Sequence, residues 1–119
     1  MAIDLKFRQQ AGVLRVDISG PWDGAAMQEA IVTIGAEADR SKLERLLVDV
    51  TGVSRPKAEI DRFFAGVRWA EHFPSRYRAA FVVTTALYNG FAELVARNRG
   101  ANVAVYFDEE SARKWLDER

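Results

Sequence analysis

The sequence predicts a single α/β domain with a mixed, mostly parallel sheet and helices packed on it. Short apolar runs alternate with longer segments whose apolar residues recur every three or four positions, which is typical of strands joined by crossover helices. Near the N-terminus, two segments instead alternate apolar and polar residues, as half-buried antiparallel strands do. At 119 residues the chain has the length of one domain. We therefore expect one unit over residues 1–119, in the order ββαβαβαβα.

The first two strands are expected to form an antiparallel hairpin across Gln9-Gln10-Ala11-Gly12. Gly20-Pro21 ends the second strand, and Asp23 can cap the following helix because its carboxylate accepts hydrogen bonds from free N–H groups of the first turn. The expected apolar positions of this hairpin and helix are Ile3, Leu5, Phe7, Leu14, Val16, Ile18, Met27, Ile31, Ile34 and Ala38.

Three later runs, at residues 46–50, 79–83 and 103–107, predict parallel strands, the first two of them covered on both faces. Pro56 suits the first turn of a helix, where its missing N–H is not needed, and Pro74 ends that segment. A further helix stops at Gly100, and Asp108 caps the last one. The expected apolar faces are Ile60, Phe63, Phe64 and Val67, then Leu87, Phe91, Leu94 and Val95, and finally Ala112, Trp115 and Leu116.

Composition excludes several classes of function. Seventeen basic side chains balance seventeen acidic ones, so the chain has no overall positive field that would favour the binding of nucleic acid. The absence of cysteine removes disulfides, thiolate metal sites and thiol nucleophiles, and we expect no metal and no cofactor. The first residues carry charges where a signal peptide needs an apolar run, and no stretch reaches the roughly 20 apolar residues of a membrane span. The expected compartment is the cytoplasm.

Residues 46–54, Leu-Leu-Val-Asp-Val-Thr-Gly-Val-Ser, resemble the third-strand signature of STAS domains, the anti-sigma-factor antagonist family. Residues 16–20, Val-Asp-Ile-Ser-Gly, are similar to the second strand of that family. Residues 105–116 resemble its SpoIIAA-like branch, which shares features with CRAL-TRIO lipid-binding domains. The resemblance implies a non-enzymatic regulatory protein-interaction module, with the binding of a small apolar ligand or lipid as the alternative.

The sequence departs from this family just after the third strand. In the antagonists an Asp-Ser-Ser-Gly type turn carries a serine that the partner kinase phosphorylates, which switches binding off by charge. Here the stretch is Arg55-Pro56-Lys57-Ala58-Glu59, so the phosphoswitch is not carried over. Ala58 or Glu59 stands where the phosphoserine would be. Glu59 either replaces that charge permanently or stabilises a helix N-terminus, and we favour stabilisation.

The candidate binding residues are Thr51, Ser54, Arg55 and Lys57, together with His72 discussed below. Thr51, Ser54, Arg55 and Lys57 lie in a loop that begins at the carboxyl end of a central strand and ends at a helix N-terminus. Open α/β sheets bind ligands and anions at such positions. Alternatively, the hydroxyls satisfy local backbone groups and the cations are solvated. The second interpretation is favoured, since the glycine-rich spacing of a phosphate cradle is missing.

No catalytic set of residues can be read from the sequence. His72 is expected at a helix C-terminus, where the dipole stabilises its cation, and this role is favoured over that of a general base. Asp23 and Asp49 can be interpreted as a carboxylate pair, but Asp23 has a capping role and Asp49 matches an aspartate of the family. Catalysis is therefore the weaker interpretation.

Two further features bear on partners. Residues 55–78 contain six basic and three acidic side chains, which indicates either a surface for an acidic partner or the solvated face of a helix. Trp69, Phe73 and Tyr77 bring more aromatic side chains to this segment than the apolar face of one amphipathic helix needs. If they are exposed they favour a homodimer or the docking of a partner, and if they are buried they belong to the core. Trp22 either anchors the first loop or lines the rim of a pocket. The phenylalanines that motivate the ligand hypothesis are Phe63, Phe64, Phe73, Phe81 and Phe91.

Overall fold

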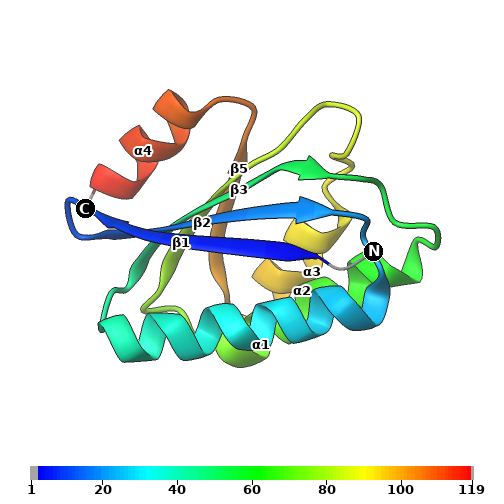
Figure 1. The fold of residues 1–119 in the computed structure, drawn as a ribbon, viewed down its shortest axis with the longest axis horizontal. Helices are drawn as coiled ribbons and strands as arrows, with labels where there is room; N and C mark the ends of the chain where they lie inside the picture. Colours follow the sequence, from blue (N-terminus) through cyan, green and yellow to red (C-terminus); the bar gives the residue numbers. More distant parts are fainter. Residues whose placement is uncertain (1–2, 119) are drawn as a thin grey trace.

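A computed structural model describes residues 3–118, which form one five-stranded sheet with helices on both faces (Figure 1). The order of elements is ββαβαβαβα, as predicted. The strands are β1 (Asp4–Gln10), β2 (Val13–Gly20), β3 (Arg45–Val53), β4 (Arg78–Val82) and β5 (Asn102–Tyr106). The helices are α1 (Gly24–Ser41), α2 (Ile60–His72), α3 (Phe91–Asn98) and α4 (Glu109–Asp117).

The strands lie in the order β1-β2-β3-β4-β5, with β1 antiparallel to β2 and all other neighbours parallel. Leu46 pairs with Ala79 and Ala79 with Val103, so the three apolar runs lie side by side in one direction, as expected. The hairpin turn is shorter than predicted, because β1 continues to Gln10. Ala11 and Gly12 both have positive φ, as in the two-residue turns that match strand twist.

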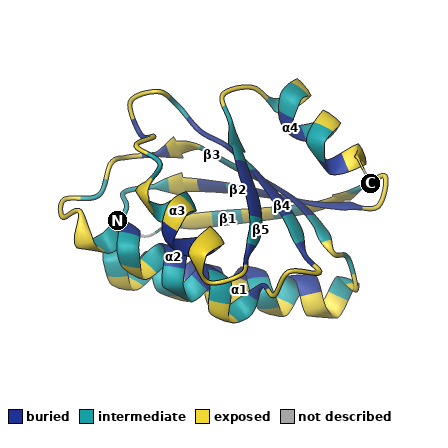
Figure 2. Ribbon diagram, turned by 180° about the vertical axis from the view of Figure 1, so that it is seen from behind, coloured by how far each residue is buried: buried dark blue, intermediate teal, exposed yellow. Residues whose placement is uncertain are grey.

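Helices α1, α2 and α3 cover one face of the sheet, and α4 covers part of the other (Figure 1). Strand β3 is buried on both sides, since Leu46 and Val48 enter the core under the three helices while Leu47 packs beneath α4 (Figure 2). Strands at the centre of a doubly covered sheet show this continuous apolar pattern. No helix among residues 3–118 is both long and apolar enough to cross a bilayer.

Helix α1 begins as predicted. The carboxylate of Asp23 accepts a hydrogen bond from the backbone N–H of Ala26 at 3.1 Å. Met27, Ile31 and Ile34 of this helix are buried against the sheet. The apolar stripe predicted for this segment is therefore confirmed.

Replacing Asp23 with alanine is expected to lower the free energy of unfolding by about 1 kcal/mol, because the first turn of α1 loses its cap. Urea denaturation followed by circular dichroism measures the change. Asp23→Asn is the control, since its side-chain oxygen can accept the same bond and should leave stability within about 0.5 kcal/mol of the original. Equal losses in both variants would contradict the capping role.

Helix α2 differs from its prediction in start and in orientation. It begins at Ile60, so Pro56 lies outside it, in the preceding loop. The buried residues of α2 are Arg62, Gly66 and Trp69, whereas Ile60 and Phe64 are 54% and 44% exposed. The reason is the close approach of α3: a Cβ on Gly66 would lie 2.7 Å from the carbonyl oxygen of residue 92. Only a face that carries glycine permits this contact.

The helix predicted before Gly100 is also shorter than expected. It begins at Phe91, so Leu87 lies in the loop before it, although its side chain is buried. Val95 faces the core, but Leu94 is exposed. Phe107 lies beyond the end of β5 and is exposed as well. In these segments the spacing of apolar residues did not identify which of them would be covered.

Trp69, Phe73 and Tyr77 belong to the core. The rings of Trp69 and Phe73 stack with centroids 4.0 Å apart, and Tyr77 meets Phe73 edge-on at 5.3 Å. All three side chains are buried in a single chain. The exposed aromatic patch from which a homodimer was expected is therefore absent at these residues, and the interpretation as core is confirmed.

Candidate functional site

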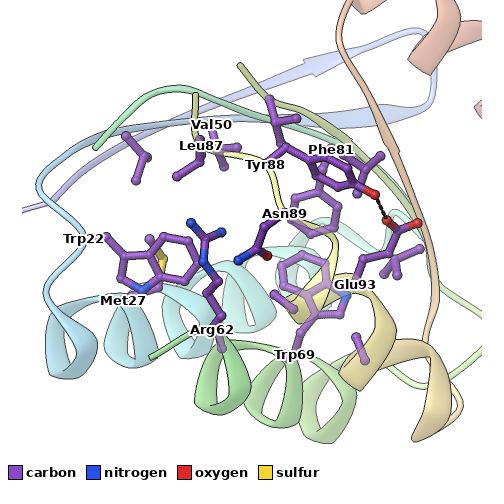
Figure 3. Close-up of a pocket in the computed structure, with 18 of the residues that line it drawn as sticks. Trp22, Met27, Val50, Arg62, Trp69, Phe81, Leu87, Tyr88, Asn89 and Glu93 are labelled. Atoms are coloured by element: carbon purple, nitrogen blue, oxygen red, sulfur yellow. Dashed lines mark hydrogen bonds between the residues drawn. The ribbon is translucent and has the colours of Figure 1, made fainter. Parts of the chain in front are cut away.

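An apolar cavity of about 130 Å³ lies between the sheet and the layer of α1, α2 and α3 (Figure 3). Its walls include residues near the carboxyl ends of the parallel strands, namely Ile18, Val50, Val53, Val83 and Val105. Open α/β sheets bind ligands at this end of their strands. The cavity thus occupies the expected end of the sheet, but it lies inside the domain rather than in the loop after β3.

One buried cation, Arg62, points into this cavity from α2, between Trp22 and Asn89 (Figure 3). Only 4% of the residue is exposed, and its Nε is buried without a hydrogen bond. The carboxylate of Glu59 lies 3.1 Å from that nitrogen, but the N–H is not directed at it. The guanidinium also stands over the indole of Trp22, 5.4 Å from the ring centroid. Burial lowers the pKa of Arg62, which means that the charged form is poorly solvated.

The rim of the cavity is held by hydrogen bonds in the segment before α3. The amide of Asn89 donates to Glu59 at 2.6 Å and accepts from the backbone N–H of Phe91 at 2.9 Å. The hydroxyl of Tyr88 donates to Glu93 at 3.0 Å, and this bond raises the pKa of Tyr88. The rim therefore links the N-terminus of α2 to α3.

Replacing Arg62 with methionine is expected to stabilise the domain by about 1 kcal/mol, because it removes a buried charge and keeps the side-chain volume. Residues retained at a cost in stability are typical of functional sites. Thermal and urea unfolding measure the effect. Loss of more than about 2 kcal/mol would show instead that the guanidinium supports the fold.

Four of the predicted binding residues lie outside the cavity. Thr51, Ser54, Arg55 and Lys57 are all exposed at the end of β3 and in the loop that follows. The hydroxyl and the N–H of Thr51 donate to Asp49 at 2.6 and 2.9 Å, and the N–H of Ser54 donates to a backbone carbonyl of β2 at 3.1 Å. These local bonds correspond to the interpretation that the sequence favoured.

His72 lies at the opposite end of α2 from that loop. Twelve residues separate it from Ile60, which at 1.5 Å per residue places them about 18 Å apart. Its side chain packs against α1 at Gly35. The structure therefore does not bring His72 together with the other predicted binding residues.

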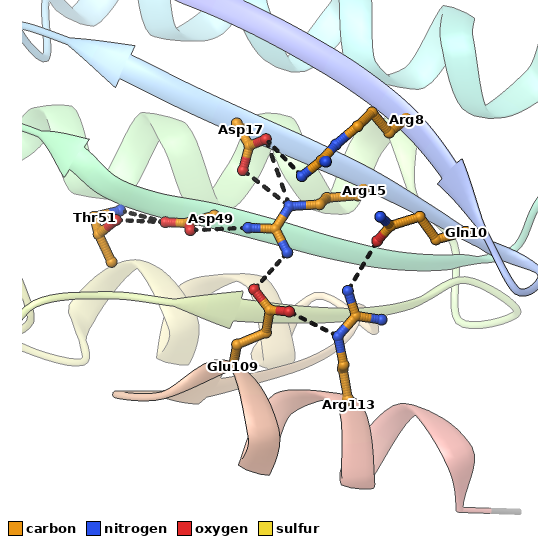
Figure 4. Close-up of polar contacts among 8 residues, drawn as sticks. All are labelled: Arg8, Gln10, Arg15, Asp17, Asp49, Thr51, Glu109 and Arg113. Carbon is orange, nitrogen blue, oxygen red and sulfur yellow. Dashed lines mark hydrogen bonds and ion pairs between the residues drawn. The ribbon is translucent and has the colours of Figure 1, made fainter.

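Asp23 and Asp49 do not form a catalytic pair. Asp23 caps α1 on one side of the sheet, whereas Asp49 faces the side that α4 partly covers (Figure 4). There the nearly buried guanidinium of Arg15 contacts Asp17 at 3.1 Å, Asp49 at 3.2 Å and also Glu109. Asp49 is thus a partner in a structural ion network. Among residues 3–118 no group of three histidine or acidic side chains could hold a metal ion.

The basic residues of the stretch 55–78 do not form one surface. Arg62 lines the cavity, while the guanidinium of Arg78 stacks over Trp115 of α4 at 4.1 Å, on the other face of the sheet. Arg68 pairs with a glutamate of α2, and Arg76 with one before β3. In the loop before α2, the exposed cations Arg55 and Lys57 form no ion pair among the described residues.

The residues that sequence reasoning missed are Arg62 and Asn89. A signal for the first was present, because Arg62, Gly66 and Trp69 follow one another at spacings of four and three and so share a helix face. The arginine and the glycine interrupt the apolar pattern on this face, so the spacing of apolar residues predicted that a different face of the helix would be buried. Trp22, for which both roles were open, lines the cavity and packs against the core.

Solved structures with this fold share little sequence with the chain. An anti-sigma factor antagonist from Mycobacterium paratuberculosis has a TM-score of 0.69 and 16% identity, over 98% of this chain and 96% of that one. An uncharacterized protein with a SpoIIAA-like fold from Shewanella loihica has a TM-score of 0.55 and 14% identity, over 97% and 94%. No protein-family model and no curated protein matches the sequence. The chain therefore has the SpoIIAA-like α/β fold seen in an anti-sigma factor antagonist, which is the fold that its strand motifs predicted.

Proposed function

We propose that the chain is a non-enzymatic regulatory module of the cytoplasm that docks a protein partner through residues 54–64. The observation that carries this proposal is an exposed apolar pair on α2, Ile60 and Phe64, one helical turn apart. The loop just before them holds the exposed cations Arg55 and Lys57. We call these four residues the docking surface.

The composition of the docking surface suits a protein interface. Interfaces of this kind combine a small apolar centre with a polar or charged rim. Ile60 and Phe64 supply the centre, and Arg55 and Lys57 favour a partner with acidic side chains around an apolar patch. The fold supports the same function by analogy, since one protein that shares it is an anti-sigma factor antagonist. With Arg-Pro-Lys-Ala-Glu after β3, the proposal includes no phosphoserine switch there.

The test is affinity capture from a lysate of the source organism, followed by calorimetry with the purified partner. The double variant Ile60→Ser/Phe64→Ser should weaken the partner's binding at least about tenfold, because it removes the apolar centre. Val32→Ser is the matched control, since Val32 is a comparably exposed apolar residue on α1. Equal affinity for the double variant and the original, or the same loss in the control, would overturn the proposal.

The cavity favours a second function, the binding of a small apolar ligand. Its apolar walls enclose space that the core side chains leave unfilled. Its volume of about 130 Å³ is close to the roughly 150 Å³ cavities that bind benzene, so one ring fits and a long acyl chain does not. Toluene at increasing concentration should raise the unfolding midpoint of the protein. An unchanged midpoint at saturating toluene would remove this candidate.

A further inference from the structure

We propose that the cavity recognises small monocarboxylic acids, pairing the carboxylate with Arg62 and enclosing a compact apolar group of about one ring. This inference rests on the second function above and specifies its ligand class. The cavity supplies two recognition elements within one space, an apolar wall and a single buried cation. A ligand that satisfies both must be amphipathic, with its charge at one end.

The state of Arg62 indicates an anion. Its Nε is buried without a hydrogen bond, and its guanidinium points into the cavity (Figure 3). A buried guanidinium without a well-aligned acceptor is unfavourable in the empty protein, so an incoming anion would satisfy it. The planar fork of arginine matches the two oxygens of a carboxylate. Glu59 does not fill this role well, because its side chain is 61% exposed and its contact with Nε is poorly aligned.

The surrounding charges favour a monoanion over a phosphate dianion. Glu59 lies 3.1 Å from Nε of Arg62, and Glu93 also lines the cavity. A dianion would meet repulsion from both carboxylates and would have a single buried cation to neutralise it. The carboxylate of Glu93 is already engaged by Arg97 at 3.0 Å and by Tyr88, so it does not compete for Arg62.

The apolar part of the ligand is limited by the walls. The cavity is lined by Val50 and Phe81 of the sheet and by Trp69 of α2, all apolar. A volume of about 130 Å³ accommodates a phenyl ring or a branched chain of similar size. Small aryl and branched-chain acids therefore fit, whereas acetate has no apolar group to fill the space between the walls.

Phenylacetate, its neutral isostere phenylacetamide, and acetate are the probes, and titration calorimetry measures their affinities. Phenylacetate should bind at least about tenfold more tightly than phenylacetamide, because only the carboxylate forms a charge-assisted pair. Acetate should bind more weakly still. The indole N–H resonance of Trp22, which is buried without a hydrogen bond, should shift during the phenylacetate titration.

Arg62→Met should remove the preference for phenylacetate and leave the affinity for phenylacetamide unchanged. Arg68→Met is the matched control, because Arg68 lies on the same helix outside the cavity and should retain the preference. Equal affinities of the original protein for the two probes would overturn the role of Arg62 while leaving apolar-ligand binding in place. Failure of both probes and of toluene to bind, with no shift at Trp22, would overturn both.

Discussion

Replacing Phe73 with alanine is expected to lower the free energy of unfolding by about 3–5 kcal/mol. Phe73 is 1% exposed and is the largest of the fully buried side chains of the core. Its ring stacks on Trp69 and meets Tyr77 edge-on, so truncation removes two aromatic contacts and leaves a void that this tightly packed end of α2 cannot close. Urea unfolding monitored by tryptophan fluorescence and circular dichroism measures the loss.

Phe64→Ala is the matched control for this prediction. It removes the same side-chain atoms, but Phe64 lies within α2 and is 44% exposed, so the loss should stay below about 1 kcal/mol. Similar losses in the two variants would contradict the assignment of Phe73 to the core and of Phe64 to the surface. That result would also weaken the docking surface, which requires Phe64 to be exposed.

Replacing Arg15 with alanine is expected to cost about 2–3 kcal/mol, because three carboxylates lose their shared cation. Arg15 is nearly buried on β2 and joins Asp17, Asp49 and Glu109 into one network (Figure 4). The carboxylates are partly exposed, so water compensates for part of the loss, and the effect stays below that of a fully buried ion pair. The network also ties α4 to the sheet, since Glu109 is the first residue of that helix.

The same network predicts an acid-dependent loss of stability. The hydrogen bond from Arg15, with a second from Arg113, lowers the pKa of Glu109 below its ordinary value of 4.5. A carboxylate whose pKa is lower in the folded protein stabilises the fold fully above its unfolded pKa, and this contribution disappears as the pH falls through the folded pKa. Stability should therefore decrease below about pH 4.5, and less steeply in Arg15→Ala.

Urea unfolding at pH 7 and at a series of values down to pH 3 measures both effects. Arg40→Ala is the control, because Arg40 pairs with Glu37 on the exposed surface of α1 and should leave stability nearly unchanged at pH 7. An Arg15 variant as stable as the original at pH 7, or one with the same acid slope, would contradict the role assigned to the network.

The cavity illustrates why part of the site was not predictable. Trp22, Arg62 and Asn89 are far apart in the chain and come from three different segments. Their convergence depends on the crossovers that place α2 and α3 beside the sheet. By contrast, the loop after β3 was correctly placed at the carboxyl end of a central strand, because that position follows from the strand-to-helix order alone.

Local features were predictable from the chain because their causes lie within a few residues. The hairpin, the caps at Asp23 and Asp108 and the continuous apolar pattern of β3 each depend on neighbours in sequence. The buried face of α2 depends instead on the approach of α3, which only the packed domain provides. The contact with α3 buries the face that carries Arg62, Gly66 and Trp69. Ile60 and Phe64 remain exposed. Burial is a property of the neighbours that a side chain meets in space, and spacing along one helix does not specify them.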